Sequence, residues 1–554
     1  MKKAIMLLLV FALALACFAG CAGSKQTDTT PAPTAAPTAA PTATAAPAGT
    51  PAAETAPPAE PTPAGPALAA DQTLTVAAGR CYWETDAANG IHKNTNVWEG
   101  LTTQSEELQV QYVLAKSMQV SDDGLTWTVE LEKGVVFHDG TPFNADVAIQ
   151  NLDRTYHFNE KYDPEYRNTS NFGYIESMEA LDENTFLIHF EKPCFDFDYK
   201  ISYNYSLMLS PNSWDENGIV TIPYGTGPFK FESYDENTKD LVVVANEDYR
   251  GGAPTLKKIV FKTITDADTR LNALLSGEVD AIVDTGALIP AQVGALVGQE
   301  GIVVDSTPIT ITLYAYMNTT EGSLLSDPIL RQAISLCTDT KGICTDLLYG
   351  YGVPGVSVIT PVASQWSKDE GYIFDPAAAK ELVDQYYPDG VTIRMVLGAS
   401  SNRWPFNDVA VVMKSDLAKA GIDLEIETYD NSTRNSMLKA YDFDITIMQH
   451  SLSTGEPNFF FANHMASTGS QTKSRGTGIN DPHIDELCER ASQIADYAEK
   501  RAIYDELQDI AHDEYLILPV WHEVSAYAYK ATVQGLKMDP IFWTDYSKVS
   551  ILAD

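Results

Sequence analysis

The residues with the most reactive side chains form no recognisable catalytic or metal-binding motif. His450 and His464 lie fourteen residues apart with no carboxylate paired to them, which is a poor pattern for a transition-metal site. His522-Glu523 lacks the second histidine that a zinc-protease helix carries four positions after the first. The chain also has no GxSxG nucleophile turn and no GxxxxGK[ST] phosphate loop. We therefore expect a protein that is not an enzyme and that holds no metal or cofactor.

The excess of acidic side chains argues against nucleic-acid binding and leaves a glycoside hydrolase as an alternative. The chain has 75 Asp and Glu residues against 37 Lys and Arg residues, which gives a formal net charge of −38. A chain of this charge lacks the basic face that nucleic-acid binding requires. Chance pairs of carboxylates are abundant at this composition. An exported glycoside hydrolase, which would use two acids about 5–9 Å apart, is therefore the alternative from another functional class.

The cysteines do not indicate a disulfide framework. Seven cysteines in 554 residues are too few for one, and none forms a CxxC pair. Five lie beyond residue 70, at Cys81, Cys194, Cys337, Cys344 and Cys488. We expect them to be packing thiols, although an exported location would permit a disulfide.

The N-terminus has the pattern of an export signal. Two lysines precede an apolar run at 5–16, which is too short to cross a bilayer comfortably. Residues 18–21 read Phe-Ala-Gly-Cys and resemble a bacterial lipobox, whose cysteine is lipidated and becomes the new N-terminus. We expect a lipoprotein signal peptide at 1–20 and a lipid anchor on Cys21. The alternative is a plain signal peptide cut near Ala22.

A spacer is expected between the anchor and the folded body, at residues 21–70. From residue 24 onward this segment contains almost only Ala, Thr and Pro. Its prolines remove backbone donors and fix φ, which excludes regular helix and sheet. Such a stretch favours an extended conformation of about 3.1 Å per residue. It would lift the folded body off the membrane.

The body of the chain, residues 71–554, alternates the patterns of strands and helices. Apolar and polar residues alternate at 125–131, as in a half-buried strand. Further strands are expected at 74–76, 185–190, 241–245 and 442–448. About 480 residues can bury several cores, so we expect more than one lobe.

Helix signals are interleaved with these strands. Asn144 and Asn407 are the expected N-caps of two helices, and Pro376 occupies the first position of another. Gly277 and Gly421 are expected to end two helices. The strands that follow those helices are expected at 279–283 and 422–426. This repeated order of helix and strand favours an α/β fold.

Residues 114–147 look like the signature of a known family. They read LAKSMQVSDDGLTWTVELEKGVVFHDGTPFNADV. This segment resembles the peptide/nickel class, family 5, of extracellular solute-binding proteins, which feed ATP-driven (ABC) importers. Six further segments match the family's elements in the same order: 96–101, 225–230, 246–252, 270–281, 330–336 and 501–507. The resemblance covers nearly all of 71–554.

The resemblance implies a periplasmic-binding-protein-like α/β fold (type II, cluster C) with two lobes that close on a ligand about a hinge. It places lobe I at 71–309 and 525–554, with an extra subdomain near 103–215, and lobe II at 310–524. It also implies a monomer outside the membrane that serves the permease and ATPase subunits of an ABC importer. Short peptides are the expected cargo, and a nickel chelate is the alternative within the family. A sensor that presents its ligand to a receptor kinase is a third possibility.

The resemblance also points to ligand contacts before the turn at 455–457. Peptide-binding relatives carry an Asp shortly before this turn, which pairs with the ligand's ammonium group. Here Ser453 has that position, so Glu456 or another acid would have to supply the contact. His450 is expected to be a wall of the cleft or a core histidine. The Trp and Tyr that nickel-binding relatives show here are replaced by Ser451 and Gly455.

Further ligand contacts are expected from aromatic and basic residues near strand ends. Arg80, Tyr82 and Trp83 follow the first strand, and open α/β sheets present ligand contacts at the carboxyl ends of their strands. Trp404 lies on a polar loop before a helix. Tyr203 and Tyr205 are weaker candidates.

Overall fold

In a computed structural model of the chain, the structure describes residues 67–84, 90–158, 167–203, 206–369, 371–399 and 403–553. The expected signal peptide, Cys21, nearly all of the spacer and Tyr205 lie outside the described residues. Among the described residues, no helix combines the length and the apolar character that crossing a bilayer requires.

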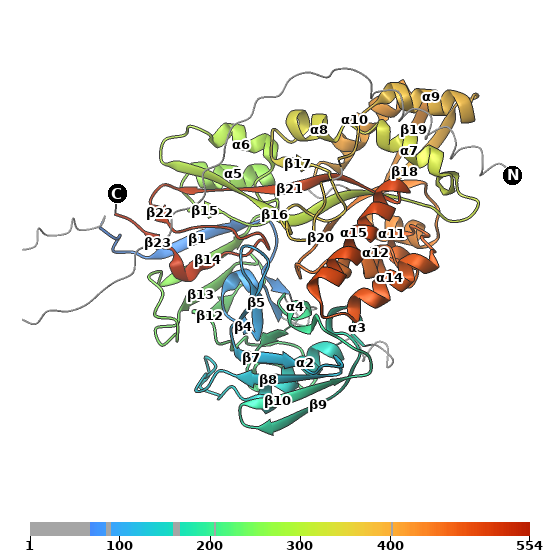
Figure 1. The fold of residues 1–554 in the computed structure, drawn as a ribbon. Helices are drawn as coiled ribbons and strands as arrows, with labels where there is room; N and C mark the ends of the chain where they lie inside the picture. The colour runs from blue at the N-terminus through green and yellow to red at the C-terminus, as the bar shows by residue number, and fades with distance from the viewer. Residues whose placement is uncertain are drawn as a thin grey trace, which may run out of the picture. The chain divides into compact units, whose positions relative to one another are not determined.

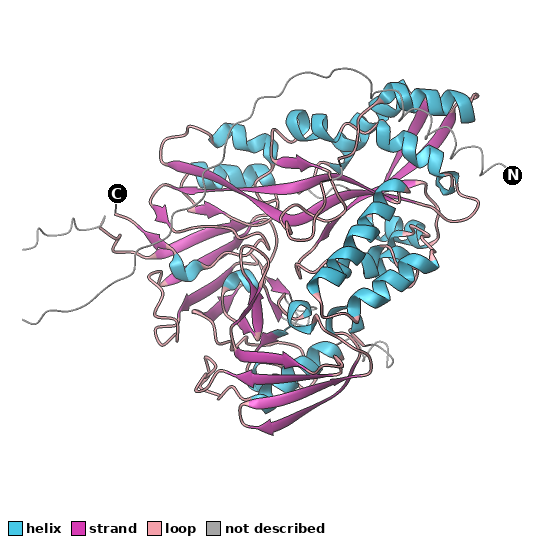
Figure 2. Ribbon diagram, viewed as in Figure 1, coloured by secondary structure: helices cyan, strands magenta, loops and turns pink. Residues whose placement is uncertain are grey.

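Eleven of the described strands form one mixed sheet (Figure 1). Its order is β12 (Phe229–Tyr234), β13 (Leu241–Ala245), β14 (Lys258–Thr263), β1 (Thr73–Ala78), β15 (Ala281–Ile282), β21 (Ile517–Lys530), β16 (Ile302–Met317), β20 (Ile445–Ser451), β18 (Val391–Gly398) and β19 (Ile422–Tyr429), and β17 (Gly352–Pro354) pairs with β21. Figure 2 shows that helices gather around β18, β19 and β20, whereas strands dominate near β12 and β13. The sheet therefore links two differently built parts of the body.

Two long antiparallel strands connect those parts. β16 and β21 pair along most of their length, and both run across the upper part of Figure 1. Their register slips between Pro308 and Thr312. A slip of this kind disrupts the ladder locally and bends the strand. It lies where the sequence places the junction of the lobes, at 309/310 and 524/525, and that junction stays a prediction.

A second, smaller sheet builds its own core. It consists of β7 (Ala115–Val120), β8 (Thr126–Leu131), β10 (Thr185–Phe190) and β9 (Ile175–Asp182), in that order. α2 (Ala145–Tyr156) contacts β9 and β10, and the helix and sheet bury Trp127, Leu152 and Phe186 between them. The predicted alternation of 125–131 thus corresponds to a strand with one face in this core.

The remaining helices lie mainly against the two ends of the large sheet. They include α4 (Phe197–Lys200), α5 (Ala267–Leu275), α6 (Pro290–Leu296), α7 (Pro328–Leu336), α9 (Pro376–Tyr386), α10 (Phe406–Lys419), α11 (Asn431–Lys439), α12 (Asn458–His464), α13 (Ser470–Arg475), α14 (Pro482–Ser492) and α15 (Tyr497–Asp513). α12 contacts both α13 and α14, and α14 contacts α15, so these helices form one group.

Most of the expected helix ends are confirmed, with one correction. The side chain of Asn144 accepts a hydrogen bond from the backbone of Val147 at 3.0 Å, as an N-cap does. Asn407, in contrast, does not cap α10. It lies inside the first turn, because the helix begins one residue earlier, directly after Pro405.

Several strands differ from their predicted ranges, and β1 and β19 are three residues longer than expected. β15 has two residues rather than the five expected at 279–283. β20 begins three residues later than expected, after Asp444. The carboxylate of Asp444 accepts a hydrogen bond from the backbone of Arg394 at 2.7 Å, and Asp442 pairs with the Arg394 side chain. These acidic residues therefore bind the neighbouring strand through side chains before the β20 ladder begins.

The five cysteines of the body are free thiols, which confirms the expectation of packing residues. Cys194, Cys337, Cys344 and Cys488 are buried, and Cys81 is half-buried.

We predict that Asn151→Ala destabilises the small-sheet region. The buried Asn151 side chain donates to the carbonyls of Val147 and Leu209 at 2.9 Å and accepts from Leu209 N at 3.0 Å. The substitution leaves both backbone groups of Leu209 without these partners, which should cost about 2–4 kcal/mol. Urea unfolding of the variant measures this loss. The matched control is Gln150→Ala at an exposed position of the same helix, and equal unfolding midpoints for the two variants would contradict the assignment.

Candidate ligand-binding site

The segments that follow β1 and β15 meet through an ion pair between a half-buried arginine and a buried aspartate. Arg80 Nη2 donates to Asp284 Oδ1 at 3.1 Å, and the same oxygen accepts from Thr285 N at 2.8 Å. Burial would raise the pKa of Asp284, but the guanidinium groups of Arg80 and Arg403 outweigh this effect and hold the pKa below its ordinary value. The carboxylate of Asp284 therefore stays charged and fixes the position of Arg80.

A loop from the other part of the sheet reaches the same place. Arg403 and Trp404 precede α10, and Trp404 Nε1 donates to Glu523 Oε2 on β21 at 2.8 Å. Arg403 packs against Gly286, which has φ of 63°, and a Cβ at Gly286 would lie 3.1 Å from Arg403 Cβ. The close approach of Arg403 thus requires a glycine at this turn.

Buried hydrogen-bond donors remain unused at this meeting point. Arg80 Nε, Arg403 Nε and Thr285 Oγ1 are buried and have no hydrogen-bond partner within the described part of the chain. A buried donor without a partner costs about 1–3 kcal/mol, so such groups normally bind water or a ligand. Two guanidinium groups with free donors suit an anion, and a carboxylate above all.

Arg403 and Trp404 line a cavity of about 590 Å³. Its other walls are the start of α5 with Asp266 and Asp268, the start of α6, the segment 347–349 and the start of α10 up to Asp408. The volume is within the usual range for small-molecule sites. The segments come from both predicted lobes, so a solute held here would contact both.

Two of the predicted contacts following β1 pack against other rings of the chain. Tyr82 is 1% exposed and stacks on His92, with ring centroids 4.9 Å apart. Trp83 is half-buried and stacks on Tyr234 of β12 at 5.3 Å. The structure therefore brings Arg80 and Trp404 to the candidate site, whereas Tyr82 lies in the core next to it and Trp83 packs on β12.

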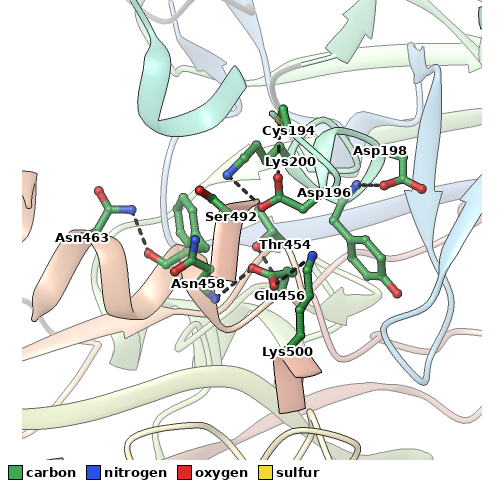
Figure 3. Close-up of polar contacts among 12 residues, drawn as sticks. Cys194, Asp196, Asp198, Lys200, Thr454, Glu456, Asn458, Asn463, Ser492 and Lys500 are labelled. Atoms are coloured by element: carbon green, nitrogen blue, oxygen red, sulfur yellow. Dashed lines mark hydrogen bonds and ion pairs between the residues drawn. The ribbon is translucent and has the colours of Figure 1, made fainter. Parts of the chain in front are cut away.

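Glu456 lies in a second polar region, which Figure 3 shows, and Ser453 precedes it in the same turn. Ser453 is buried, and its carbonyl accepts from Gln104 Nε2 at 2.6 Å. Glu456 is also buried, and Oε2 accepts from Asn458 N at 2.8 Å while Oε1 accepts from the Tyr504 hydroxyl. The Glu456 carboxylate thus caps the start of α12 and is already bonded within the chain.

His450 lies among aromatic rings rather than among acids. Its ring centroid is 4.1 Å from that of His464 and 5.6 Å from that of Phe459. Burial and the nearby Arg475 lower the pKa of His450 to about 3, so the ring is neutral. The positive charge of Arg475 opposes a metal cation at this pair. Among the described residues, no group of three or more His, Cys, Asp or Glu side chains could hold a metal ion.

Several residues of these two regions were missed in the sequence. Asp284 and Arg403 carry the charge of the first region, and Lys200 and Lys500 that of the second. Arg403 was detectable, since it adjoins Trp404 in the same polar loop. Asp284 lies 204 residues from its partner Arg80, and Lys500 lies 44 residues from Glu456. Lys200 pairs with Asp196 only four residues away, but such a pair looks the same in the sequence as the many surface charges.

The chain belongs to the bacterial extracellular solute-binding proteins, family 5. A model described as "Bacterial extracellular solute-binding proteins, family 5 Middle" matches residues 109–472, which is more than half of the chain. This finding confirms the class predicted from the motifs, an extracellular solute-binding protein of family 5. The family consists of solute-binding proteins that work outside the cytoplasm.

Curated relatives match over most of their length. The glutathione-binding protein GsiB of Salmonella choleraesuis (strain SC-B67) is 27% identical over 492 residues, which cover 86% of this chain and 93% of the relative. GsiB of Escherichia coli O1:K1 / APEC is 27% identical over 457 residues, covering 80% of this chain and 86% of the relative.

Solved structures share the fold. The periplasmic binding protein DppA from Helicobacter pylori in complex with the peptide STSA is 24% identical, with a TM-score of 0.72 and coverage of 87% of this chain and 98% of that one. NikA from Brucella suis in complex with Fe(III)-EDTA is 20% identical, with a TM-score of 0.77 and coverage of 86% and 99%. The predicted two-lobed α/β fold is thereby confirmed.

We predict that Glu523 makes stability depend on pH. Burial raises the pKa of Glu523 to about 7, although Trp404 and Arg403 oppose the shift and Asp284 adds to it. Between about pH 4.5 and 7 the folded chain keeps a proton that the unfolded chain releases, so this group lowers stability as the pH rises. Glu523→Gln removes the titration.

The stability of Glu523→Gln relative to the parent chain should therefore improve by about 2–3 kcal/mol from pH 5 to pH 8. Urea unfolding at both pH values measures the difference, with Glu425→Gln at an exposed position as control. A difference that does not change with pH would contradict the raised pKa.

Proposed function

We propose that this chain captures a small peptide-like solute between its two lobes and delivers it unchanged to the permease of an ABC importer. The observation that carries the proposal is the pair of guanidinium groups, Arg80 and Arg403, whose buried Nε donors have no partner among the described residues. Arg403 also lines the 590 Å³ cavity. Glutathione, the solute in the name of the GsiB relatives, carries two carboxylates and fits this chemistry. The chain itself makes and breaks no bond.

Capture would couple ligand binding to closure of the lobes. Arg80 comes from predicted lobe I (71–309 and 525–554), and Arg403 from predicted lobe II (310–524). A carboxylate between them would satisfy donors of both lobes at once, and only such a differential contact can favour the closed state. The register slip of β16 and β21 near Pro308 supplies a bend at the point where the lobes would rotate.

The same proposal includes the attachment of the protein to the cell. The lipobox-like segment ending at Cys21 and the proline-rich spacer to residue 70 suit a lipid-anchored monomer on the outer face of the membrane. The permease and ATPase subunits would be its partners. The subdomain near 103–215 would belong to lobe I, since its small sheet has a core of its own.

We predict that Arg403→Gln weakens binding of glutathione by at least 30-fold, because a charged donor pair to a buried carboxylate contributes about 2 kcal/mol or more. Isothermal titration calorimetry measures the dissociation constant, and native mass spectrometry of the freshly purified protein identifies any solute already bound. Arg490→Gln, at an exposed position of α14, is the control. Equal weakening by both substitutions, or binding that survives Arg403→Gln, would refute the role of Arg403. A protein that carries and binds no small solute would refute the function.

We predict that Cys21→Ser releases the protein from the membrane, because the anchor requires the cysteine thiol. Cell fractionation should move the variant from the membrane to the soluble fraction, and Cys17→Ser, four residues earlier, should leave it in place. Retention of Cys21→Ser in the membrane fraction would exclude the lipid anchor.

A further inference from the structure

The second polar region contains a buried ion cluster formed by Asp196, Lys200, Glu456 and Lys500 (Figure 3). Lys200 Nζ lies 3.1 Å from Asp196 Oδ2, at the two ends of α4. Lys500 Nζ, on α15, lies 4.0 Å from Glu456 Oε1. Asp196 and Lys200 belong to the predicted subdomain of lobe I, and the other two belong to predicted lobe II. The cluster thus joins the two halves with charges that all come from the chain.

The electrostatics of the cluster show that its charges interact across this junction. Burial alone would raise the pKa of Asp196, but Lys200 and then Lys500 hold the pKa below its ordinary value. Burial raises the pKa of Glu456, and Lys500 and Lys200 both oppose that shift. Each carboxylate therefore has ammonium groups from both halves of the chain near it.

The backbone of the turn next to the cluster is also in contact with other side chains of the protein. The carbonyl of Ser453 accepts from the side chain of Gln104, which in turn donates to Ser202 at 2.8 Å. Leu108 lies against Gly455, where an added Cβ would be 3.0 Å from Leu108 Cβ. The turn before α12 is thus covered by side chains of the first lobe.

The two polar regions differ in what they leave unbonded. In the first region, the unused buried groups are donors of Arg80, Arg403 and Thr285. In the ion cluster, both carboxylate oxygens of Glu456 accept hydrogen bonds, and Asp196 accepts from Lys200 and Cys194. Two buried acceptors also remain without a partner there among the described residues, the amide oxygens of Gln104 and Asn458. The buried carboxylates of Asp284, Asp196 and Glu456 already have partners in the chain, whereas guanidinium donors of the first region are free for a ligand carboxylate.

We propose that the cleft selects solutes by their carboxylate groups and does not require a free amino group, because the ammonium groups of Lys200 and Lys500 already occupy the buried acids. The preferred class is then anionic carboxylates, including peptides whose amino group is acylated. This inference rests on the proposed function and specifies the solute class of the same cleft.

Asp198, beside the cluster, is the alternative partner for a ligand ammonium. Asp198 is half-buried, and Oδ1 accepts from the backbone of its neighbour Tyr199 at 2.9 Å. Burial raises the pKa of Asp198 to about 6. If a ligand ammonium were bound, Asp198 would be its partner.

Three matched probes test the inference by calorimetry at pH 7.5: glutathione, N-acetylglutathione and the glycine ethyl ester of glutathione. We expect N-acetylation to change the dissociation constant by less than 3-fold and esterification to raise it at least 10-fold. An N-acetyl probe that binds at least 10-fold more weakly than glutathione would overturn the inference, and loss of that difference in Asp198→Asn would assign the ammonium to Asp198.

A variant of the cluster provides a second, independent test. In Lys500→Gln one ammonium is removed, so the free amine of glutathione gains a partner and glutathione should bind at least 5-fold more tightly than N-acetylglutathione. Lys439→Gln, an exposed position on α11, should keep the two probes equivalent. If Lys500→Gln binds glutathione and N-acetylglutathione with the same dissociation constant, the lysines of the cluster do not take the place of a ligand ammonium.

The failure of this inference can be told apart from failure of the proposed function. If none of the three probes binds, glutathione-like cargo is excluded. Small molecules released from the purified protein are then acetylated in one portion and esterified in another, and both portions are returned to the stripped protein. Native mass spectrometry should detect rebinding of acetylated and not of esterified molecules, and the reverse result overturns the inference. A protein that releases and rebinds nothing overturns both proposals.

Discussion

The cleft of this protein is organised by the requirement that buried charges be paired. An ionised side chain removed from water is costly unless a partner of opposite charge and several hydrogen bonds compensate for it. Asp284 meets this requirement through Arg80, and Asp196 through Lys200. Arg403 does not meet it within the described residues, since its Nε donor is buried and unpartnered. The proposed ligand chemistry rests on this one imbalance, because an anion entering the cleft would complete contacts that the chain has left unfinished.

The long strands β16 and β21 explain how such a site can both hold and release a solute. They belong to the same sheet as the strands on either side, so the two parts of the body cannot separate. The slip in their register near Pro308 leaves the ladder irregular over a few residues, where bending disrupts few hydrogen bonds. Rotation at this point would move Arg403 away from Arg80 without disturbing either core. The ion cluster of Asp196 and Glu456 would separate in the same motion, so closure depends on protein–protein charges as well as on the ligand.

The sequence predicted the fold more completely than the site, for physical reasons. Strand and helix periodicity is local, so β10, β13 and the Asn144 cap could be assigned from a few adjacent residues. Asn407 was misassigned as a cap because a preceding proline and the anchoring of Trp404 on Glu523 determine where α10 begins. Arg80 and Trp404 were predicted as ligand contacts from their places after a strand and before a helix, and that role stays a prediction. Asp284 and Lys500 were not, because their significance depends on partners that lie far away in the sequence and only the tertiary fold identifies them.

The measurement that tests the central claim most directly is small-angle X-ray scattering of the folded body with and without glutathione, at matched concentration. If the lobes close on a carboxylate held by Arg80 and Arg403, saturating glutathione should reduce the radius of gyration by about 1 Å or more, as hinge closure around a ligand does. The same addition to Arg403→Gln should leave the radius unchanged. A parent protein that binds a solute tightly and shows identical scattering before and after would contradict the account.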